Sequence, residues 1–435
     1  MSDADNRTFV IVGGGLAGAK AAETLRAEGF GGRVLLCGDE SVRPYERPPL
    51  SKDYLRGDTG FDDAAVHATN FYPDHDIELR TSCTVEELDV SASEVRLSTG
   101  ERLAYDRLLL ATGAEPRRLR TPGAELSGVH YLRTVADSDA IRAAATSGVP
   151  VVVVGAGWIG AEVAASARQL GADVAMVDAL SVPLERVLGR EVGAVYRDLH
   201  EAKGVRLHLD AAIESFAGGD VVEEVRLSDG TSLPAGAVVV GIGVVPRTGL
   251  AESAGLALDN GVVTDAFLAT SAPGVYAAGD VANAWHPHYE THIRLEHWSA
   301  ALNQGPAAAK NMLGTATPYA KVPYFFSDQY ELGMEYRGWA SGSDRVVFRG
   351  DPAGGEFIAF WVSEVGVVRA AMNANVWDQG EKIDALLAAG HAVDLGALAD
   401  PGSDLASPAP AGGGLGPDAP ATARAEQGVS SAPSR

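Results

Sequence analysis

The sequence predicts an α/β protein with two Rossmann-like dinucleotide-binding domains, a small C-terminal α+β domain and a disordered tail. A glycine-rich turn of the G-x-G-x-x-G type occurs twice, at 13–18 and at 155–160. Each copy follows an apolar run, precedes a helix-like stretch and has an acidic residue at the distance where a nucleotide ribose would need one. One such motif is weak evidence, but two in this context predict two bound dinucleotides. The alternative for each is a glycine turn that binds nothing.

The first glycine turn lies between a strand expected over 9–12 and a helix expected over 19–28. In such a unit the first glycine makes the turn, the second lets the backbone approach a pyrophosphate, and the third lets helix and strand pack closely. Phosphates bind there because free N–H groups and the helix dipole favour anions. The predicted cofactor-binding residues of this turn are Gly13, Gly15, Leu16, Ala17 and Gly18. A second strand, expected over 34–37, leads to Asp39, the first choice for binding an adenosine ribose.

The second turn repeats the arrangement, with a strand over 151–154, a helix over 161–170 and a further strand that ends at Asp178. A carboxylate there suits the free 2′-hydroxyl of NAD and repels the 2′-phosphate of NADP. The nearest basic residue downstream, Arg186, lies well past the strand, so NADH is favoured over NADPH. The residues predicted to bind NADH are Gly155, Gly157, Ile159, Gly160, Glu162, Asp178, Arg186 and Gly243.

Length and composition restrict the class of protein. The 435 residues leave room for about three domains, and 46% hydrophobic content fits a core-forming chain. No apolar run is long enough to span a bilayer and no signal segment is visible, so a cytoplasmic protein without a membrane partner is expected. A net charge of −23 argues against nucleic acid. With only Cys37 and Cys83, neither a C-x-x-C redox pair nor a cysteine-rich metal site is predicted.

A pattern of hairpin followed by buried strand occurs in both halves, over 95–110 and over 225–243, which suggests an internal duplication with one copy in each dinucleotide domain. Past residue 325, strands over 357–362 and 365–370 and a helix over 380–389 predict the small α+β domain. From 398 to 435 the composition is dominated by Pro, Ala, Gly and Ser, which predicts disorder without a visible role.

Longer segments carry a resemblance to a known family. They are Arg43-Pro-Tyr-Glu-Arg-Pro-Pro-Leu-Ser-Lys52, Ala111-Thr112-Gly113, Ala277-Ala-Gly-Asp-Val-Ala282, Arg294 to Trp298 and Tyr324 to Tyr330. With the two glycine turns, they resemble FAD-dependent NAD(P)H:ferredoxin reductases of the putidaredoxin reductase and oxygenase-coupled class, relatives of the apoptosis-inducing factor flavoproteins. The Pro-Pro-Leu-Ser-Lys and Glu-His-Trp segments distinguish this class from its disulfide-using cousins.

The resemblance implies an FAD domain over 1–114 and 246–325, an NADH domain over 115–245, and a C-terminal domain over 326–397 that shapes the acceptor face. Asp280 would bind the ribityl chain and Trp298 would lie beside the isoalloxazine, although a turn residue and a core tryptophan are the alternatives. The positions that the resemblance assigns to FAD are Arg47, Lys52, Val85, Ala111, Thr112, Gly113, Arg133, Gly279, Asp280 and Trp298.

The resemblance also places the redox centre at Lys52 and Glu162. Lys52 would lie near flavin N5 and pair with Glu162, which would also meet the nicotinamide end of NADH. A cation held there stabilises negative charge that builds on the ring. The alternatives are a solvated loop lysine and a first-turn helix acid favoured by the dipole.

The implied activity is hydride transfer from NADH to FAD, then single-electron transfer to a small iron–sulfur ferredoxin that serves a cytochrome P450 or a ring-hydroxylating oxygenase. Two departures from the family pattern, Phe326 in place of Trp and the segment 372–378, leave the identity of the ferredoxin open. Trp377 could line the acceptor side or belong to the core. The arginines considered for steering the ferredoxin are Arg43, Arg294, Arg337 and Arg369.

Two other functions stay open at this point. An NADH oxidase or peroxidase would pass electrons to oxygen species, commonly with a redox-active cysteine in the matching region, where this chain has none. An NADH-sensing flavoprotein would instead produce a conformational output.

Overall fold

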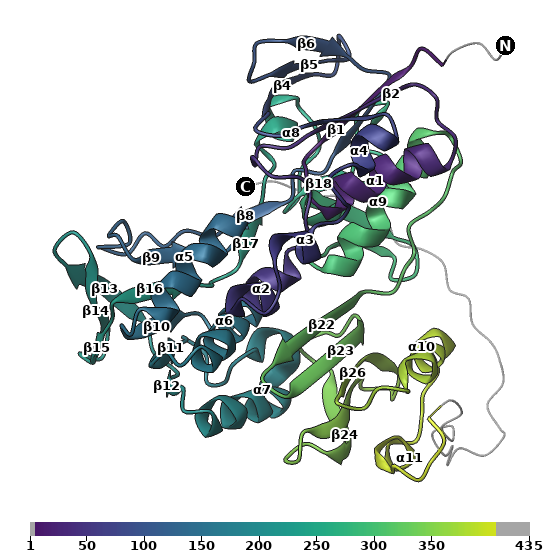
Figure 1. The fold of residues 1–435 in the computed structure, drawn as a ribbon. Coiled ribbons are helices and arrows are strands. Elements are labelled where there is room, and N and C mark those ends of the chain that lie inside the picture. The colour runs from purple at the N-terminus through teal and green to yellow at the C-terminus, as the bar shows by residue number, and fades with distance from the viewer. Residues whose placement is uncertain (1–4, 406–435) are drawn as a thin grey trace, which may run out of the picture.

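The computed structural model describes residues 5–405, which fold into three domains (Figure 1). The first domain is built on a five-stranded parallel sheet of order β19-β7-β1-β2-β3. Its strands are β1 (Thr8–Val12), β2 (Arg33–Cys37), β3 (Ile77–Arg80), β7 (Arg107–Leu110) and β19 (Val275–Ala277). The last of these strands comes from far along the chain, so residues on both sides of the second domain build one sheet.

Alternate residues of β1 are buried against different layers. Phe9 and Ile11 pack with α1 (Leu16–Ala27) and α9 (Trp298–Met312), while Val10 and Val12 face the antiparallel sheet of β4 (Val85–Asp89), β5 (Glu94–Leu97) and β6 (Arg102–Ala104). Burial of both faces explains why the strand reads as a continuous apolar run. The remaining elements of this domain are η1 (Pro48–Ser51), α2 (Asp53–Arg56), α3 (Phe61–Ala64), α4 (Phe71–Asp74), α8 (Gly249–Ser253), β18 (Val262–Thr264), η2 (Gly279–Val281), β20 (Ala282–His286) and β21 (Thr291–Arg294).

The second domain repeats this plan. Its parallel sheet has the order β12-β11-β10-β16-β9, with β10 (Val151–Val154) in the place that β1 takes in the first domain. Val151 and Val153 pack under α5 (Val135–Thr146) and α6 (Trp158–Gln169), while Val152 and Val154 face a second three-stranded antiparallel sheet. The other elements are β9 (Val129–Tyr131), β11 (Val174–Val177), α7 (Glu185–Ala202), β12 (Arg206–His208), β13 (Ile213–Gly218), β14 (Val222–Leu227), β15 (Ser232–Pro234) and β16 (Ala237–Val240).

The chain passes between these two domains through a two-stranded antiparallel ribbon. β8 (Ala114–Pro116) leads out of the first domain and β17 (Val244–Pro246) leads back, with Ala114 opposite Pro246 and Pro116 opposite Val244. Both crossings therefore lie side by side, at the positions where the sequence suggests the domain limits.

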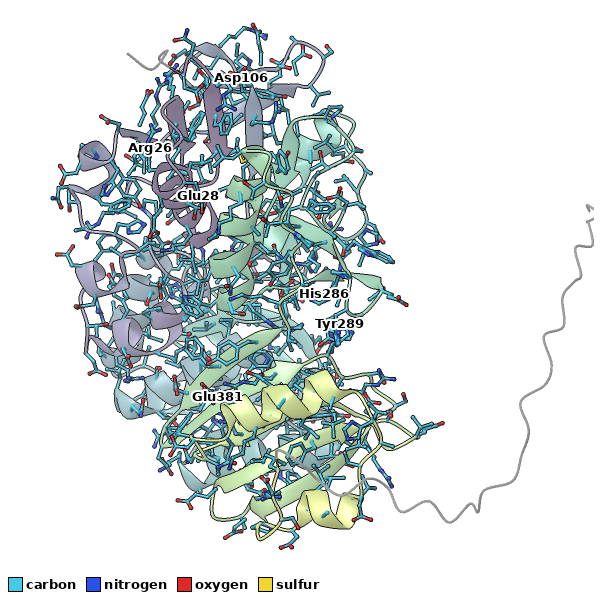
Figure 2. The ribbon with its side chains drawn as sticks, turned by 90° about the vertical axis from the view of Figure 1, so that its right-hand side faces the viewer. Arg26, Glu28, Asp106, His286, Tyr289 and Glu381 are labelled. Carbon is cyan, nitrogen blue, oxygen red and sulfur yellow. The ribbon has the colours of Figure 1, made fainter. Side chains whose placement is uncertain are left out.

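The C-terminal domain is an antiparallel sheet covered on both faces. Its strands have the order β22-β23-β26-β25-β24 and are β22 (Tyr324–Gln329), β23 (Leu332–Gly338), β24 (Arg345–Asp351), β25 (Glu356–Val362) and β26 (Val368–Ala374). Phe357 and Trp361 pack toward α7 of the second domain, while Ile358 and Phe360 pack under α10 (Gly380–Ala389) and α11 (Leu395–Ala399). Figure 2 shows this domain as a separate layer, with Glu381 on α10 and Tyr289 of the β20–β21 hairpin on the side of the first domain nearest to it.

Three expectations about boundaries need correction. Both motif helices begin inside the glycine turns, at Leu16 and Trp158, because Gly15 and Gly157 are themselves the N-cap residues. β22 begins at Tyr324, before the expected limit at 326. The strand expected over 365–370 lies later, at Val368–Ala374, because Val365 is in an exposed turn.

The prediction of disorder from residue 398 is wrong for 398–405. Leu398 and Leu405 are 0% and 1% exposed and belong to the core beneath β25. Besides these leucines, Arg349 of β24 holds the stretch, because it donates hydrogen bonds to the carbonyl oxygens of Leu398, Pro401 and Ser403. A composition average shows none of these contacts. The rest of the predicted tail, 406–435, lies outside the described residues.

The contact between α1 and α9 gives a test of this packing. A Cβ added at Gly305 of α9 would lie 2.3 Å from the Ala17 carbonyl oxygen of α1. We expect Gly305→Ala to lower the free energy of unfolding by about 1–3 kcal/mol, since the helices must move apart. Gly219→Ala, where an added Cβ meets nothing within 4 Å, is the matched control and should stay within about 0.5 kcal/mol. Urea unfolding measures both, and equal losses would contradict the close approach.

Candidate functional site

A cavity of about 940 Å³ opens where the first sheet, the second domain and β22 meet. Most small-molecule sites have volumes between about 300 and 1,000 Å³, so this cavity is near the upper end of that range. A long ligand such as a dinucleotide needs a cavity of this size. The predicted site residues that line it are Gly13, Gly15, Leu16, Ala17, Asp39, Arg47, Lys52, Val85, Ala111, Thr112, Gly113, Arg133, Ile159, Glu162, Gly279, Asp280 and Trp298.

The first glycine turn forms one wall of this cavity. Gly13 has φ +122°, and a Cβ there would lie 2.0 Å from the Ala111 carbonyl oxygen. A Cβ at Gly18 would lie 2.1 Å from the Gly13 carbonyl oxygen, so Gly18 serves helix packing and does not line the cavity. Gly15 has open space where its side chain would be, and no side chain caps α1. The first N–H groups of α1 are thus open to an anion, as a pyrophosphate requires.

The three motif glycines of the second turn have the same surroundings as those of the first. A Cβ at Gly155 would lie 2.4 Å from the Gly241 carbonyl oxygen, one at Gly160 would lie 1.9 Å from the Gly155 carbonyl oxygen, and Gly157 faces open space. No side chain caps α6 either. These three glycines, together with Asp178, Arg186 and Gly243, lie outside the wall of this cavity.

Asp178 has a structural task that the sequence did not reveal. Its carboxylate accepts hydrogen bonds from the backbone N–H groups of Ala156, at 2.6 Å, and Leu180, at 2.8 Å. It therefore holds the glycine turn against the end of β11. Arg186 is exposed at the start of α7.

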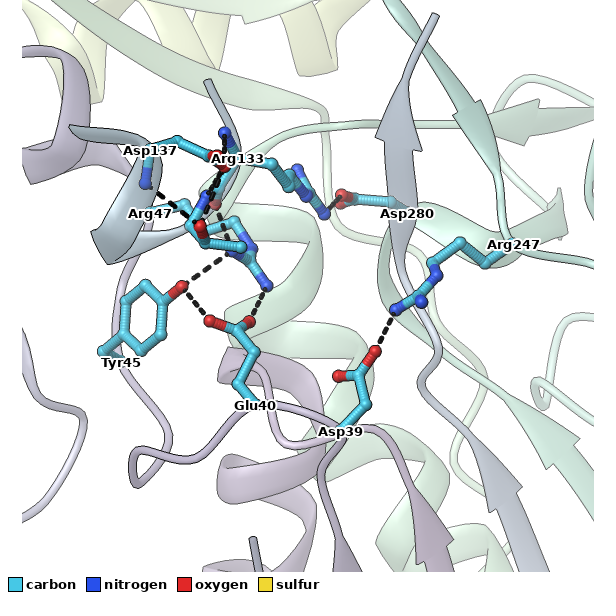
Figure 3. A network of polar contacts seen from close by, with 9 residues as sticks. Asp39, Glu40, Tyr45, Arg47, Arg133, Asp137, Arg247 and Asp280 are labelled. Carbon is cyan, nitrogen blue, oxygen red and sulfur yellow. Dashed lines mark hydrogen bonds and ion pairs between the residues drawn. The ribbon is translucent and has the colours of Figure 1, made fainter. Parts of the chain in front are cut away.

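Charged side chains on one side of the cavity form a network (Figure 3). Arg47 donates to Glu40 Oε1 at 2.9 Å, to the Tyr45 hydroxyl at 3.0 Å and to the Arg133 carbonyl oxygen. Arg133 donates to Asp280 Oδ2 at 2.8 Å. Burial, and then the nearby Arg47 charge, lower the pKa of Arg133. Two guanidiniums, each paired with one carboxylate, thus lie near each other in the cavity wall.

Asp39 is engaged differently from its neighbour Glu40. Its Oδ2 accepts a hydrogen bond of 2.8 Å from Arg247, which comes from the segment that follows β17 (Figure 3). Arg247 is itself fixed by its backbone, since its N–H donates to the Gly113 carbonyl oxygen and its carbonyl accepts from the Thr112 hydroxyl. Sequence reasoning missed Arg247 because nothing local marks a residue whose partner lies in a distant loop.

Lys52 and Glu162 form a buried ion pair. Lys52 Nζ lies 3.3 Å from Glu162 Oε2, and the two residues are 7% and 4% exposed. Glu162 also accepts hydrogen bonds from the hydroxyls of Ser51, at 2.5 Å, and Ser327, at 2.7 Å. Lys52 Nζ also lies 5.4 Å from the centre of the Phe326 ring. Lys52 is therefore not a solvated loop lysine, and Glu162, the fifth residue of α6, is not an acid of the first helical turn.

Some buried polar atoms at the cavity have no partner among the described residues. They include Arg133 Nε and His297 Nδ1. Burial lowers the pKa of His297 to about 4, so its ring is neutral at ordinary pH. Unsatisfied buried donors are costly, and a bound ligand is one means of satisfying them. Together with the uncapped helix α1 and the paired guanidiniums, they make the cavity fit an FAD-sized dinucleotide.

The arginines considered for steering a partner are mostly engaged elsewhere. Arg43 pairs with Asp62, Arg294 with Glu296, and Arg337 with Glu335 and Asp384, and these three arginines are largely buried. Only Arg369 of the four is exposed. Trp377 is 52% exposed, so it does not belong to the core, and it does not line the cavity. A place on the acceptor side stays a prediction. Within residues 5–405, no helix combines the length and apolar character needed to cross a membrane.

Comparison with known proteins shows which family the chain belongs to. The family model described as pyridine nucleotide-disulphide oxidoreductase matches residues 7–305, and the one described as reductase C-terminal matches 324–409. The chain is 41% identical to the anthranilate 1,2-dioxygenase system ferredoxin–NAD(+) reductase component of Burkholderia cepacia, over 90% of this chain and 97% of that protein. It is 37% identical to putidaredoxin reductase of Pseudomonas putida, over 82% of this chain and 86% of that protein.

Solved structures agree with these relatives. The ferredoxin reductase for the CYP199A2 system from Rhodopseudomonas palustris matches with a TM-score of 0.88 and 35% identity, over 92% of this chain and 99% of that chain. The reductase in the covalent putidaredoxin reductase–putidaredoxin complex matches with a TM-score of 0.87 and 34% identity, over 92% of this chain and 98% of that one.

The buried pair can be tested by a double-mutant cycle. Removing one member leaves an uncompensated buried charge, so Lys52→Met and Glu162→Gln should each lower the free energy of unfolding by about 3–5 kcal/mol. The double variant should lose clearly less than the sum, because no unpaired charge remains. Urea unfolding of the four proteins with excess FAD measures this coupling. Additive losses would mean that the two side chains do not interact.

The Asp39–Arg247 contact gives a second test. Arg247→Ala leaves Asp39 without its partner, and an ion pair this exposed contributes about 0.2–1 kcal/mol, so FAD affinity should fall by a factor of about 1.5 to 5. FMN lacks the adenosine half, so its affinity should not change if Asp39 serves that half. Arg107→Ala, an exposed arginine away from the cavity, is the control. Fluorescence titration of the flavin-free protein measures both flavins, and an equal loss for FMN would contradict the assignment.

Proposed function

Because the chain belongs to the pyridine nucleotide-disulphide oxidoreductase family, we propose that it is an NADH-dependent ferredoxin reductase that supplies electrons to an oxygenase or a cytochrome P450. Its curated relatives are reductases of dioxygenase and P450 systems, and the chain spans nearly their whole length. The observation that carries the proposal is the Lys52–Glu162 pair, buried in the wall of a cavity where all three domains meet.

The chain uses FAD and a nicotinamide dinucleotide, as its family does. When bound, FAD accepts a hydride from the nicotinamide and releases electrons one at a time, which lets a two-electron donor serve a one-electron acceptor. We assign the 940 Å³ cavity to FAD, with the N-terminus of α1 and the guanidiniums of Arg47 and Arg133 at the pyrophosphate. Asp39 takes the adenosine ribose, Asp280 the ribityl chain, and Trp298 the ring.

Lys52 supplies a fixed positive charge at the reacting end of this cavity. Glu162 holds the ammonium group in place, since its Oε2 lies 3.3 Å from Lys52 Nζ. The hydroxyls of Ser51 and Ser327 hold both oxygens of Glu162, so the carboxylate cannot rotate away from the lysine without losing a hydrogen bond. A charge oriented in advance in a site poor in water stabilises charge that develops on a ligand more strongly than mobile water does.

The second glycine turn is assigned to the coenzyme. Ile159, at the start of α6, is 41% exposed and lines the cavity three positions before Glu162 on the same helix. The helix therefore carries the predicted pyrophosphate site at its beginning and the buried acid one turn further on. A coenzyme whose pyrophosphate binds at Gly157 can extend along α6 so that its nicotinamide lies near Glu162.

An oxidase or peroxidase of a related fold commonly uses a redox-active cysteine beside the reacting end of the flavin. Cys37 and Cys83 lie at the other end of the cavity, next to Gly38 and Asp39, so no observation favours that function. We further propose a cytoplasmic location, because NADH is produced there and reducing conditions keep both cysteines as the thiols seen.

The function is tested on the purified full-length protein. We expect a flavin absorbance spectrum that bleaches with NADH, and rapid NADH-driven reduction of cytochrome c only when a ferredoxin is added. Reduction of cytochrome c that does not depend on ferredoxin, or rapid peroxide formation in air, would favour the oxidase instead. Bleaching without transfer to any ferredoxin tested would favour the NADH-sensing flavoprotein.

Coenzyme choice gives a further prediction. Asp178→Arg removes the charge that repels a 2′-phosphate, so kcat/KM for NADPH should rise relative to that for NADH. Because the same carboxylate holds the N–H groups of Ala156 and Leu180, kcat/KM for NADH should also fall, by roughly tenfold or more. Asp220→Arg, an equal charge change on an exposed loop, should alter neither value. An unchanged ratio of the two coenzymes in Asp178→Arg would show that this residue does not set the preference.

A further inference from the structure

The two cysteines of the chain lie together in the cavity wall. Cys37 is the last residue of β2, and its side chain belongs to the core cluster that contains Cys83, Val85 and Leu88. Cys83 lies between β3 and β4, and its N–H donates to the carbonyl oxygen of Gly38 at 2.8 Å. Both line the cavity, yet they are only 2% and 5% exposed. Two segments that are distant in sequence thus bring both sulfur atoms to one spot.

The thiols also influence one another electrostatically. Burial first and the neighbouring Cys83 second raise the pKa of Cys37 to about 12, so Cys37 stays a protonated thiol and its oxidation is slow. Both are free thiols, and reaction at either requires access from the cavity side. On the assignment of this cavity to FAD, a bound flavin covers that side.

We propose that Cys37 and Cys83 form a dithiol site that a hydroperoxide oxidises to an intramolecular disulfide when the cavity contains no flavin. One thiol takes the terminal oxygen of the hydroperoxide and releases an alcohol, or water in the case of hydrogen peroxide. The second sulfur displaces that oxygen as water, and the S–S bond forms. The two cysteines lose two electrons and two protons in total, and the peroxide O–O bond is reduced and broken.

The bond would join two parts of the predicted adenosine end. Asp39 follows Cys37 by two positions, and Val85 follows Cys83 by two. The proposed disulfide would therefore link the two segments that face the adenosine. A disulfide fixes the two Cβ atoms at about 3.8 Å from each other, so these segments can no longer move independently when FAD binds. We therefore expect the oxidised protein to bind FAD more weakly until a thiol reductant opens the bond. This effect rests on the proposed flavin site, whereas disulfide formation itself does not.

The test compares the full-length protein with bound FAD and after FAD removal, each treated with hydrogen peroxide. After quenching, the protein is unfolded and its free thiols are labelled with N-ethylmaleimide for intact-mass spectrometry. We expect the flavin-free protein to take up no label and to weigh about 2 Da less than before oxidation, while the FAD-bound protein takes up two labels. Dithiothreitol should restore both labels and FAD rebinding, which also shows that the flavin-free protein stayed folded.

The Cys83→Ser variant is the matched control, because it keeps the size of the side chain but cannot form the bond. We expect it to show no loss of 2 Da and no loss of FAD affinity after peroxide. Two labels on the peroxide-treated flavin-free protein would overturn the proposal. A disulfide that forms equally fast with FAD bound would keep the dithiol site but refute both the protection and the placing of FAD in this cavity.

Discussion

The buried contact between Lys52 and Glu162 fixes how three distant parts of the chain are placed relative to one another. Lys52 lies at the junction of η1 and α2, Glu162 on α6 of the second domain, and Ser327, which holds the acid, on β22 of the C-terminal domain. Removing two charges from water is costly unless their geometry and hydrogen bonds compensate. The pair therefore requires the three domains to meet in one arrangement, and the large cavity lies where they do.

The same steric rule governs the packing of both glycine turns. In each copy the first glycine lies under a carbonyl oxygen of a neighbouring strand end, and the third lies against the carbonyl oxygen of the first. Any side chain at those positions would push the helix off the sheet. Only the middle glycine faces open space, so one residue in each turn is left free for a ligand while its neighbours are fixed by packing.

Patterns that depend on neighbours in sequence were predictable, and contacts that depend on distant segments were not. Gly13, Gly15 and Gly18 identify their roles by spacing alone, because sterics within one βαβ unit require them. Arg247 contacts Asp39 from the segment that follows the second domain, and no pattern in the neighbouring sequence predicts this contact. Arg43, Arg294 and Arg337 resemble free surface charges in the sequence, but neighbouring acids neutralise them. Leu398 and Leu405 escape a composition argument because two apolar contacts hardly change an average.

The ribbon of β8 and β17 has an architectural consequence. Since the outgoing and returning strands are hydrogen-bonded neighbours, the whole of the second domain is an insertion whose two ends lie next to each other. Such a unit can be exchanged between homologues without altering the path of the host chain. A graft of this kind would still have to carry an acid at the position of Glu162 on α6, because Lys52 of the host would otherwise be a buried charge without its partner.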